Sequence, residues 1–572
     1  MTSLPLPIRG SQSVPALPVS QPHQAAGRVH LGLSIADLRW LLSPKALGII
    51  WQPAPFSLPN PLRGQQILAG NYAGASGLIS LAGHAPWQHA AEVAAHGFDW
   101  LDDLASLGNR PARDLAQAWL ALWIRDHDRP FARQGKAWTL EAISARQISL
   151  LTHAHFLMAG QNTADRKAMF KLLARQTAWL RHEVTRCPDP VARLHGATAW
   201  VFSTASLMGM EGVRPKAIQC LEKAAAHLST APEADLPRNP ARLASALADL
   251  VWMRAVLGRA ATPQAVQQAI TRLSDCVSVL RPPHGALARF HGCDGRAPAL
   301  LSQIQDRADE GRKPAALPRF SRAAGYIRLS CATSCLILDA SPPPLKREGD
   351  LAHASTNAME FSVNRLAFIT SCGTGAGFGP DWMRAGRATQ SHSTACLAGR
   401  SSAGLDGATL IGGATKVAQS SKPTHGAERV AVSHNAWQAD WGLHHIRALT
   451  LSHDGMRLEG EDAFAPRNEE DRAIFAARMA QTPRGSLGFS LHFHVHPTVT
   501  AQSDMGGRAA SFLLPDGQVW VLRPSEGAEL VLRPSVYFDP DHRNPRATKQ
   551  VVLFSTLADY GGAIGWCFLR AQ

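Results

Sequence analysis

The sequence lacks the features that mark several common classes of protein. No stretch reaches the roughly 18–20 consecutive apolar residues that a membrane helix needs. The first 24 residues have no basic segment followed by an apolar core, so they do not predict a secretory signal. We therefore expect a cytoplasmic protein, with a periplasmic or cell-envelope location as the alternative. Nine cysteines in 572 residues are too few for a disulfide scaffold, so buried thiols are expected.

Dense runs of lysine and arginine are also absent, although the chain is basic. It has 58 Lys and Arg against 44 Asp and Glu, which gives a formal net charge of +14. A positive surface attracts polyanions such as nucleic acid or acidic polysaccharide. The charge favours an anionic partner, and an acidic polysaccharide or oligosaccharide and a nucleic acid both remain open at this point. No recognised nucleic-acid-binding motif accompanies the charge. Nucleic-acid binding is a hypothesis that depends on charge alone.

A helical pattern runs from residue 30 to about residue 305, after an arm of residues 1–29 that is rich in Pro, Ser and Gln. Apolar residues recur at spacings of three and four, and prolines and glycines interrupt them at short intervals. Amphipathic helices are predicted over residues 140–157, 169–186, 194–210, 215–228, 241–257 and 263–280. Helices of similar length joined by short turns are typical of a helical array or toroid.

Tryptophan is concentrated in this helical half, which holds ten of the 15 tryptophans. On amphipathic helices we expect most of them to lie in the core. One or two are candidates to line a cleft and stack on sugar rings, because a flat apolar ring matches the apolar face of a sugar.

The second half of the chain has the pattern of an antiparallel β domain. Residues 306–322 are polar, contain two prolines and are predicted to form a linker. From residue 323 to residue 572 the chain consists of short β-rich runs. Asp454-Gly455 and Pro515-Asp-Gly517 each lie between two apolar runs, which is a hairpin signal. Many short strands with regular turns indicate a large β-sandwich.

Three histidines alternate along one predicted strand, at His492, His494 and His496. Three imidazoles on one strand face are potential metal ligands. Neighbouring Cβ atoms on the same face lie roughly 7 Å apart, so three in a row rarely converge on one ion. Structural hydrogen bonding is the interpretation we favour for them.

The segment that contains these histidines is similar to a known family. Phe493-His-Val-His-Pro-Thr-Val499 resembles the FHLHPDV segment of heparinase II/III C-terminal domains. Other segments match in the same order, namely residues 325–329, 336–340, 351–361, 391–394, 433–437, 457–462 and 511–514. The resemblance covers most of residues 30–570 and is stronger in the β half than in the helices.

The resemblance implies an N-terminal (α/α) toroid, then a C-terminal antiparallel β-sandwich, with a substrate cleft between them. Characterised members depolymerise acidic polysaccharides by β-elimination. That reaction needs neutralisation of the uronate carboxylate, a base for the adjacent proton and an acid for the departing oxygen. In the family a toroid Tyr and a sandwich His act as base and acid, and a toroid Asn or His helps to neutralise the carboxylate. Some members hold a structural zinc between His and Asp residues of the sandwich.

The residues that the family uses are only partly present. In the segment that resembles the HxHAD motif, the first histidine, which is the catalytic one, falls on Leu351 and the second on His353. The aspartate of that motif falls on Ser355. The histidine of the AHNT motif is His392, and His195 is the loose match for the toroid Asn or His. None of the four tyrosines lies in the late helical segment where the family has its own.

We draw the candidate site from these matches and from the histidines and arginine near the end of the helical half. A histidine pair can act as base and acid near neutral pH, and an arginine can hold a carboxylate with two hydrogen bonds. The predicted catalytic residues are His353, His392 and His195. The predicted substrate-binding residues are Arg289, His291 and His434. A structural role is the alternative for each of them.

No cofactor is expected. The family's second metal-ligand aspartate is replaced within Ser371-Cys-Gly373, so no metal site is predicted and a structural zinc is the alternative. The first functional hypothesis is a carbon–oxygen lyase that cleaves an acidic, uronate-containing glycan by β-elimination in the cleft. The second is a catalytically degenerate glycan-binding or envelope-assembly protein on the same scaffold. The sequence leaves the oligomeric state open.

Overall fold

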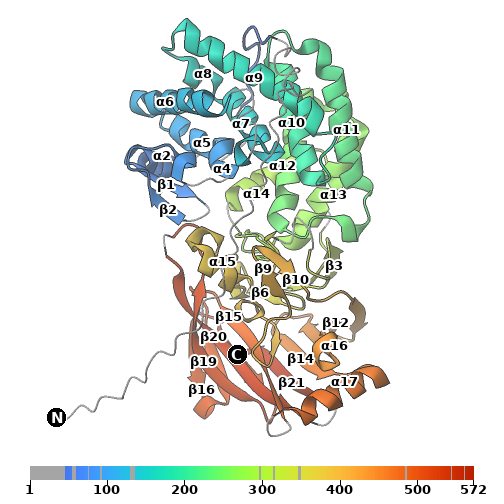
Figure 1. The fold of residues 1–572 in the computed structure, drawn as a ribbon. Coiled ribbons are helices and arrows are strands. Elements are labelled where there is room, and N and C mark those ends of the chain that lie inside the picture. Colours follow the sequence, from blue (N-terminus) through green and yellow to red (C-terminus); the bar gives the residue numbers. More distant parts are fainter. Residues whose placement is uncertain are drawn as a thin grey trace, which may run out of the picture.

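A computed structural model describes residues 45–54, 60–74, 77–89, 93–128, 135–295, 298–312, 316–344, 350–482, 486–542, 544–558 and 561–571. These residues form a helical half followed by a half made mostly of strands (Figure 1). The predicted fold class is therefore confirmed. The predicted arm, residues 1–29, lies outside the described residues. At the predicted linker, the last helix of the first half ends at Ala308 and the first strand of the second begins at Phe320.

The helical half begins with short elements and continues with long antiparallel helices. Its helices are α2 (Pro61–Leu68), α3 (Pro86–His89), α4 (Val93–Gly97), α5 (Asp99–Ser106), α6 (Arg110–His127), α7 (Leu140–Thr152), α8 (Ala154–Met158), α9 (Thr163–Glu183), α10 (Pro190–Ser206), α11 (Arg214–Thr230), α12 (Pro240–Leu257), α13 (Gln264–Leu280) and α14 (Pro298–Ala308). A small hairpin of β1 (Asn71–Gly74) and β2 (Gly77–Ser80), which the sequence did not predict, lies among them. Among the described residues, no helix is long and apolar enough to cross a membrane.

Several of these helices begin at a proline that follows an Asp or Asn. α10 begins at Pro190 after Asp189, and the Asp189 carboxylate accepts the N–H groups of Val191 and Ala192 at 2.9 Å. Proline suits the first helical position because its missing N–H would have no partner there, and the side chain before it caps the free N–H groups. α10 therefore starts four residues before the apolar pattern that predicted it, which began at residue 194.

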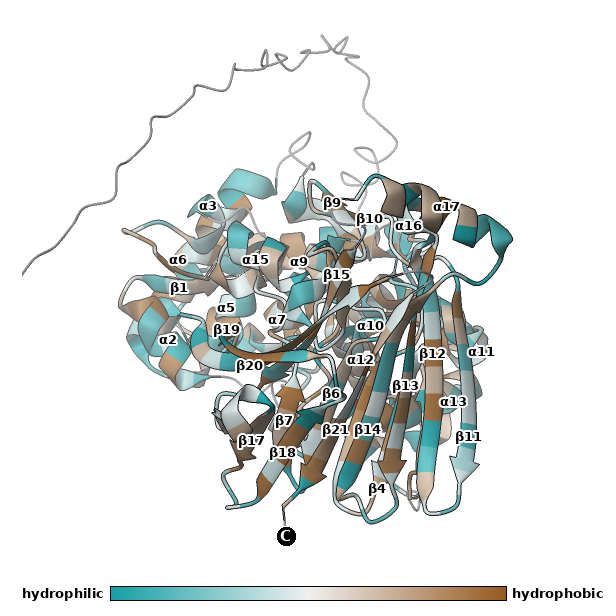
Figure 2. Cartoon of the chain, turned by 90° about the horizontal axis from the view of Figure 1, so that it is seen from below, coloured by the Kyte–Doolittle hydropathy of each residue, from teal (hydrophilic) through white to brown (hydrophobic). Residues whose placement is uncertain are grey.

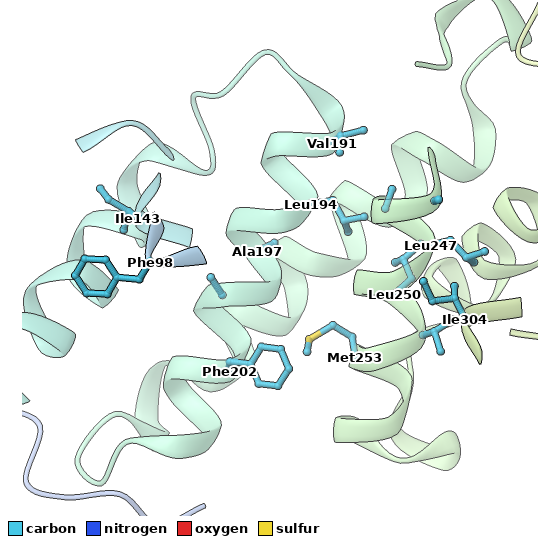
Figure 3. Close-up of a cluster of buried hydrophobic side chains, with 14 of the residues drawn as sticks. Phe98, Ile143, Val191, Leu194, Ala197, Phe202, Leu247, Leu250, Met253 and Ile304 are labelled. Carbon is cyan, nitrogen blue, oxygen red and sulfur yellow. The ribbon is translucent and has the colours of Figure 1, made fainter. Parts of the chain in front are cut away.

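The core of the toroid includes apolar residues of α7, α10, α12 and α14, together with Phe98, which precedes α5 (Figure 3). Phe98, Leu194, Phe202 and Leu247 in this cluster are completely buried. Each such side chain contributes roughly 1.5–3 kcal/mol through removal of its surface from water. Most of the tryptophans of this half are buried as well, including Trp100, so the prediction of a tryptophan-rich core is confirmed.

The second half is a sandwich of two large antiparallel sheets. Its strands are β3 (Phe320–Ala323), β4 (Tyr326–Cys331), β5 (Ser334–Asp339), β6 (Met359–Val363), β7 (Leu366–Thr370), β8 (Ala395–Leu397), β9 (Gly404–Asp406), β10 (Thr409–Ile411), β11 (Val417–Thr424), β12 (Ala427–Trp437), β13 (Leu443–Ser452), β14 (Arg457–Ala465), β15 (Leu487–Val495), β16 (Thr500–Asp504), β17 (Ala509–Leu513), β18 (Val519–Pro524), β19 (Glu529–Tyr537), β20 (Arg546–Leu557) and β21 (Gly562–Arg570). Three helices accompany them, α15 (Pro380–Gly386), α16 (Gln438–Trp441) and α17 (Glu469–Ala480).

The strand order follows from the antiparallel connections. Within the described residues, one sheet has the order β11-β12-β13-β14-β21-β18-β17-β16, and the other has the order β19-β20-β15-β7-β6-β5-β4-β3, with β8 also paired to β15. Both predicted hairpins are present: Leu451 pairs with Leu458, and Leu513 pairs with Val519. Strands β12 to β14 alternate between hydrophobic and hydrophilic residues, as expected for a sheet with one buried face (Figure 2).

Buried polar contacts join the two halves. Arg238, just before α12, forms an ion pair with Asp339 at the end of β5 and donates to the carbonyl of Ala324 at 2.8 Å. Arg328 of β4 donates to the carbonyl of Arg281, at the C-terminal end of α13, at 2.8 Å. Because these groups are buried, the contacts fix the sandwich against the toroid.

Candidate functional site

A cleft of about 590 Å³ lies where the toroid meets the sandwich. Its toroid wall is built from the beginnings of three helices. Thr139, Asp189 and Asn239 line the cleft and are the N-caps of α7, α10 and α12. Each side chain accepts a backbone N–H of its own helix, at 3.2, 2.9 and 2.9 Å respectively. The same side chains therefore start the helices and shape the cleft.

An aromatic pair forms another part of the toroid wall. Trp138 and Trp179 both line the cleft, with ring centroids 6.3 Å apart and an interplanar angle of 56°. Trp138 is almost completely buried and its indole N–H donates to the carbonyl of His127 at 3.0 Å, whereas Trp179 is half-buried. A fixed indole with a partly exposed neighbour provides the kind of surface on which a sugar ring stacks.

Charged side chains also face the cleft. Arg242 of α12 and Asp189 form an ion pair at 2.6 Å, so these two charges largely balance one another. Burial alone would raise the pKa of Asp189, but Arg242 and the capping N–H groups together hold that pKa below its ordinary value. Glu141 and Glu183 line the same cleft. Among the described residues, the Glu183 carboxylate has no hydrogen-bond or ion-pair partner.

The sandwich contributes one loop to the cleft. Asp350 and Leu351 line it, and Asp350 accepts the hydroxyl of Thr409 at 2.6 Å. Leu351 is 40% exposed. It packs on Gly292, where an added Cβ would lie 2.9 Å from the Leu351 Cβ. An apolar side chain therefore occupies the cleft position that corresponds to the first histidine of the HxHAD motif.

His353 and His392 lie beneath this wall, with both side chains completely buried. Their ring centroids are 4.9 Å apart. The N–H of Gly292 donates to His353 Nε2 at 3.1 Å. Burial lowers the pKa of His392 to about 3 and the pKa of His353 well below its ordinary value, and neighbouring histidines add to both shifts. Both rings are therefore neutral near pH 7 and out of contact with the cleft.

His291 lines the cleft but is fixed by the sandwich. Its Nδ1 accepts the backbone N–H of His353 at 3.1 Å, so Nε2 carries the proton that points at Asp339, 3.1 Å away. Asp339 also pairs with Arg238 and accepts the Ser355 hydroxyl at 2.7 Å. Burial would raise the pKa of Asp339, but Arg238 and His291 together lower it. His291 is 1% exposed, so little of its ring is accessible to a ligand.

Arg289 lies in a different pocket, of about 140 Å³. Its guanidinium stacks 3.9 Å from the ring centroid of Tyr537 and donates to the carbonyls of Cys372 and Phe538. Glu360, in the same pocket, accepts the backbone N–H of Arg289 at 3.2 Å. Nη2 of Arg289 is therefore directed at the sandwich backbone, whereas its buried Nε has no hydrogen-bond partner among the described residues.

The two remaining predicted residues lie elsewhere. His195 on α10 contacts Asp249 on α12 at 3.0 Å. Burial would lower the pKa of His195, but Asp249 and Glu141 outweigh it and raise the pKa. His434 on β12 is buried against His445, with ring nitrogens 3.2 Å apart. The structure thus brings His291, His353 and His392 together and leaves His195, Arg289 and His434 at separate places; their roles remain predictions.

The sandwich residues do not fit the zinc that some relatives hold. Ser355 stands where the motif has an aspartate, and its hydroxyl is directed at Asp339. Asp339 is already engaged by Arg238 and His291. Among the residues that the structure describes, no group of three or more His, Cys, Asp and Glu side chains is placed to hold a metal. A structural zinc needs four ligands, and His353 with His392 supplies two.

The alternating histidines of β15 are held by separate partners. His492 contacts Gln550 at 3.0 Å, and His494 contacts both Ser535, at 2.8 Å, and the carbonyl of Gln390, at 2.7 Å. His496, the residue after β15, contacts the hydroxyl of Thr498 at 2.8 Å. Each of the three histidines thus has its own hydrogen-bond partners, as the structural interpretation predicts. The cleft residues that the sequence did not single out include Asp189, Asn239 and Glu183. The Asp-Pro and Asn-Pro dipeptides are signals that could have located the first two.

Comparison with known proteins agrees with the observed fold. Residues 313–567 match the family of heparinase II/III-like C-terminal domains. The second half of the chain is therefore a heparinase II/III-like C-terminal domain. A relative from Caulobacter vibrioides (strain NA1000 / CB15N), FtsZ-localized protein C, is 29% identical over 555 residues, which cover 92% of this chain and 91% of the relative.

Solved structures of polysaccharide lyases share both halves of the chain. Heparinase III has a TM-score of 0.70 at 11% identity, covering 93% of this chain and 88% of the enzyme. Heparan sulfate lyase HepC from Pedobacter heparinus, as a mutant, has a TM-score of 0.57 at 14% identity, covering 91% and 85%. At this level of identity the similarity establishes the fold, and the fold is that of polysaccharide lyases.

Proposed function

We propose that this protein binds a glycan in the cleft between toroid and sandwich, and that it does so without the β-elimination chemistry of its family. The observation that carries the proposal is Leu351. A leucine has no ionisable group, and it stands in the cleft wall where the family motif has its catalytic histidine. The two histidines that remain in the motifs, His353 and His392, are buried and neutral near pH 7.

The described lining of the cleft also lacks the tyrosine base and an accessible histidine acid, although arginines that could neutralise a carboxylate are present. Among the described lining residues there is no tyrosine, and the one histidine, His291, is held by Asp339. A base must reach the proton that it removes, within about 2.6–3.2 Å or through one water. The aromatic pair Trp138 and Trp179 still supports sugar binding, because stacking needs no proton transfer.

The relative in Caulobacter supports a role other than polysaccharide degradation. Its name places it with FtsZ, and its similarity extends over nine-tenths of both chains. We therefore include localisation with FtsZ and a part in envelope assembly in the proposal. The proposal also includes the expected cytoplasmic location.

An active lyase is the second candidate, because the fold is shared with lyases over nine-tenths of the chain. A panel of uronate polysaccharides incubated with the purified protein distinguishes the two candidates. β-Elimination leaves an unsaturated product that absorbs in the ultraviolet. We expect no absorbance change with any polysaccharide. A change that is abolished by His291→Ala would overturn the binding-only proposal.

Binding itself is tested at Trp179. Trp179→Ala should weaken glycan binding about tenfold or more, because the loss of one stacking contact is worth about 1.4 kcal/mol. Calorimetric titration with oligosaccharides measures the effect. Trp441→Ala is the matched control, since Trp441 is a partly buried tryptophan on α16 that does not line the cleft. Equal binding by both variants would show that the cleft is not the glycan site.

A further inference from the structure

The charge of the cleft differs in sign from the charge of the whole chain. The chain carries a formal net charge of +14. Among the described residues that line the cleft, four carboxylates stand against two guanidiniums. One carboxylate and one guanidinium, Asp189 and Arg242, are paired with each other. The described lining therefore carries an excess of negative charge, in a family whose lyases act on acidic glycans.

Three of these four carboxylates have a structural explanation, and one does not. Asp350 accepts the hydroxyl of Thr409 at 2.6 Å. Glu141 lies in the first turn of α7 and Asp189 caps α10, positions where a negative charge is favoured by the helix dipole. Glu183 is the last residue of α9, where the dipole disfavours a negative charge. Among the described residues, the Glu183 carboxylate has no partner that offsets this unfavourable interaction with the helix dipole. A cationic ligand in the cleft would offset the unfavourable position of this carboxylate.

A second observation shows that the cleft is built to contact a polar molecule. Asn239 is 7% exposed, and its side-chain oxygen is occupied by the N–H of Ala241. Among the described residues, its amide nitrogen has no hydrogen-bond partner, and Asn239 is one of the residues that line the cleft. This amide is therefore available to donate to an acceptor on a ligand, such as a sugar hydroxyl.

We propose that the glycan bound in this cleft carries a free ammonium group, as an N-unsubstituted hexosamine does. This inference rests on the proposed function, because it names the ligand of the same cleft. The ring of the amino sugar stacks on Trp179, a hydroxyl accepts from Asn239 and the ammonium pairs with Glu183. A uronate at the same place would bring a further carboxylate next to Glu183 and Glu141, and an N-acetyl group would remove the positive charge.

The experiment compares three oligosaccharides of equal length by calorimetric titration of the full chain. They are an oligomer of glucosamine, the same oligomer fully N-acetylated, and an oligogalacturonate. The measurement is made at mildly acidic pH, where the amine of the oligosaccharide is protonated. Lys346 and Arg347 lie outside the described residues. The full chain is used so that the charges of these two side chains are present in the measurement. We expect the glucosamine oligomer to bind about tenfold more tightly than its acetylated form.

Glu183→Gln tests the residue itself. It should remove most of the preference for the amine and leave binding of the acetylated oligomer unchanged. Glu222→Gln is the control, because Glu222 is an exposed glutamate on α11 outside the cleft. The preference should also fall as the pH rises and the amine loses its proton.

The outcomes separate this inference from the proposed function. If the oligogalacturonate binds as tightly as the glucosamine oligomer, or if Glu183→Gln keeps the full preference, the inference is wrong. If the acetylated oligomer binds equally well in a manner that depends on Trp179, the inference is wrong while the proposed function stands. If none of the three binds, both fail.

Discussion

At the scale of single residues, burial moves the pKa of the Glu360 side chain to near neutral pH. Glu360 lies on β6, is 5% exposed and accepts backbone N–H groups of Arg289 and Ser371. Burial raises its pKa from 4.5 to about 7, although Arg289 acts in the opposite direction. Between these two values the folded chain binds more protons than the unfolded chain, so this group makes the protein less stable as the pH rises through that window.

Glu360→Gln should remove this dependence. The contribution of one such group has a slope of at most about 1.4 kcal/mol per pH unit. The free energy of unfolding, measured by chemical denaturation at several pH values between 4.5 and 7, should fall less steeply in the variant. Glu529→Gln, on the exposed start of β19, serves as the control and should keep the original slope. An unchanged slope for Glu360→Gln would mean that another group titrates in this window.

At the scale of elements, β14 and β21 are packed so closely that one position accepts only glycine. Gly460 pairs with Trp566, and an added Cβ would lie 2.1 Å from the Trp566 ring. That indole also donates to Asp462 at 2.8 Å, within a buried network that includes Arg447. The strand pairing and the network therefore depend on the same small residue.

Gly460→Ala should lower the free energy of unfolding by about 1–3 kcal/mol, because the ring must shift and its hydrogen bond weakens. Gly488→Ala on β15 is the matched control, since no atom lies within 4 Å of its added Cβ. There, loss of backbone freedom in the unfolded chain should leave stability unchanged or raise it by about 0.5–1 kcal/mol. Urea denaturation measures both. Equal destabilisation by the two variants would contradict the packing argument.

At the scale of the whole molecule, the ion pair of Arg238 and Asp339 joins the toroid to the sandwich. Both side chains are buried. Asp339→Ala should cost about 3–5 kcal/mol, because it leaves the Arg238 charge buried without a carboxylate. We further expect calorimetry to show two separate unfolding transitions, one for each half.

The surface pair of Asp275 and Arg312 provides the comparison, with side chains 61% and 33% exposed. Asp275→Ala should change the free energy of unfolding by less than about 1 kcal/mol. A single unchanged transition in Asp339→Ala would show that the two halves are held together by other contacts.

The fold was predictable because both halves follow simple periodicities. Leu451 and Leu458 flank a turn that the sequence marks with Asp454-Gly455, and the two strands pair there. The helix starts were less accurate, since α10 begins at Pro190 through its cap and not through its apolar face. Capping depends on one polar side chain, which a pattern of apolar residues does not reveal.

The site was predictable only in part, because its walls come from distant parts of the chain. Motif matches located His353 and His392, but the sequence did not show that both rings are buried. Glu183 belongs to no motif. Its position at the end of α9 and beside the cleft emerges only when the toroid and the sandwich are brought together.

The three helix caps in the cleft wall limit how the protein can diverge. A substitution at Asp189 or Asn239 that altered contact with a ligand would also remove a cap, at about 1 kcal/mol each. Glu183 and Trp179 start no helix, so they can vary without that loss. Ligand preference can therefore change at the C-terminal ends of the cleft helices with little cost to stability. Changes at the N-terminal ends of these helices would also affect folding.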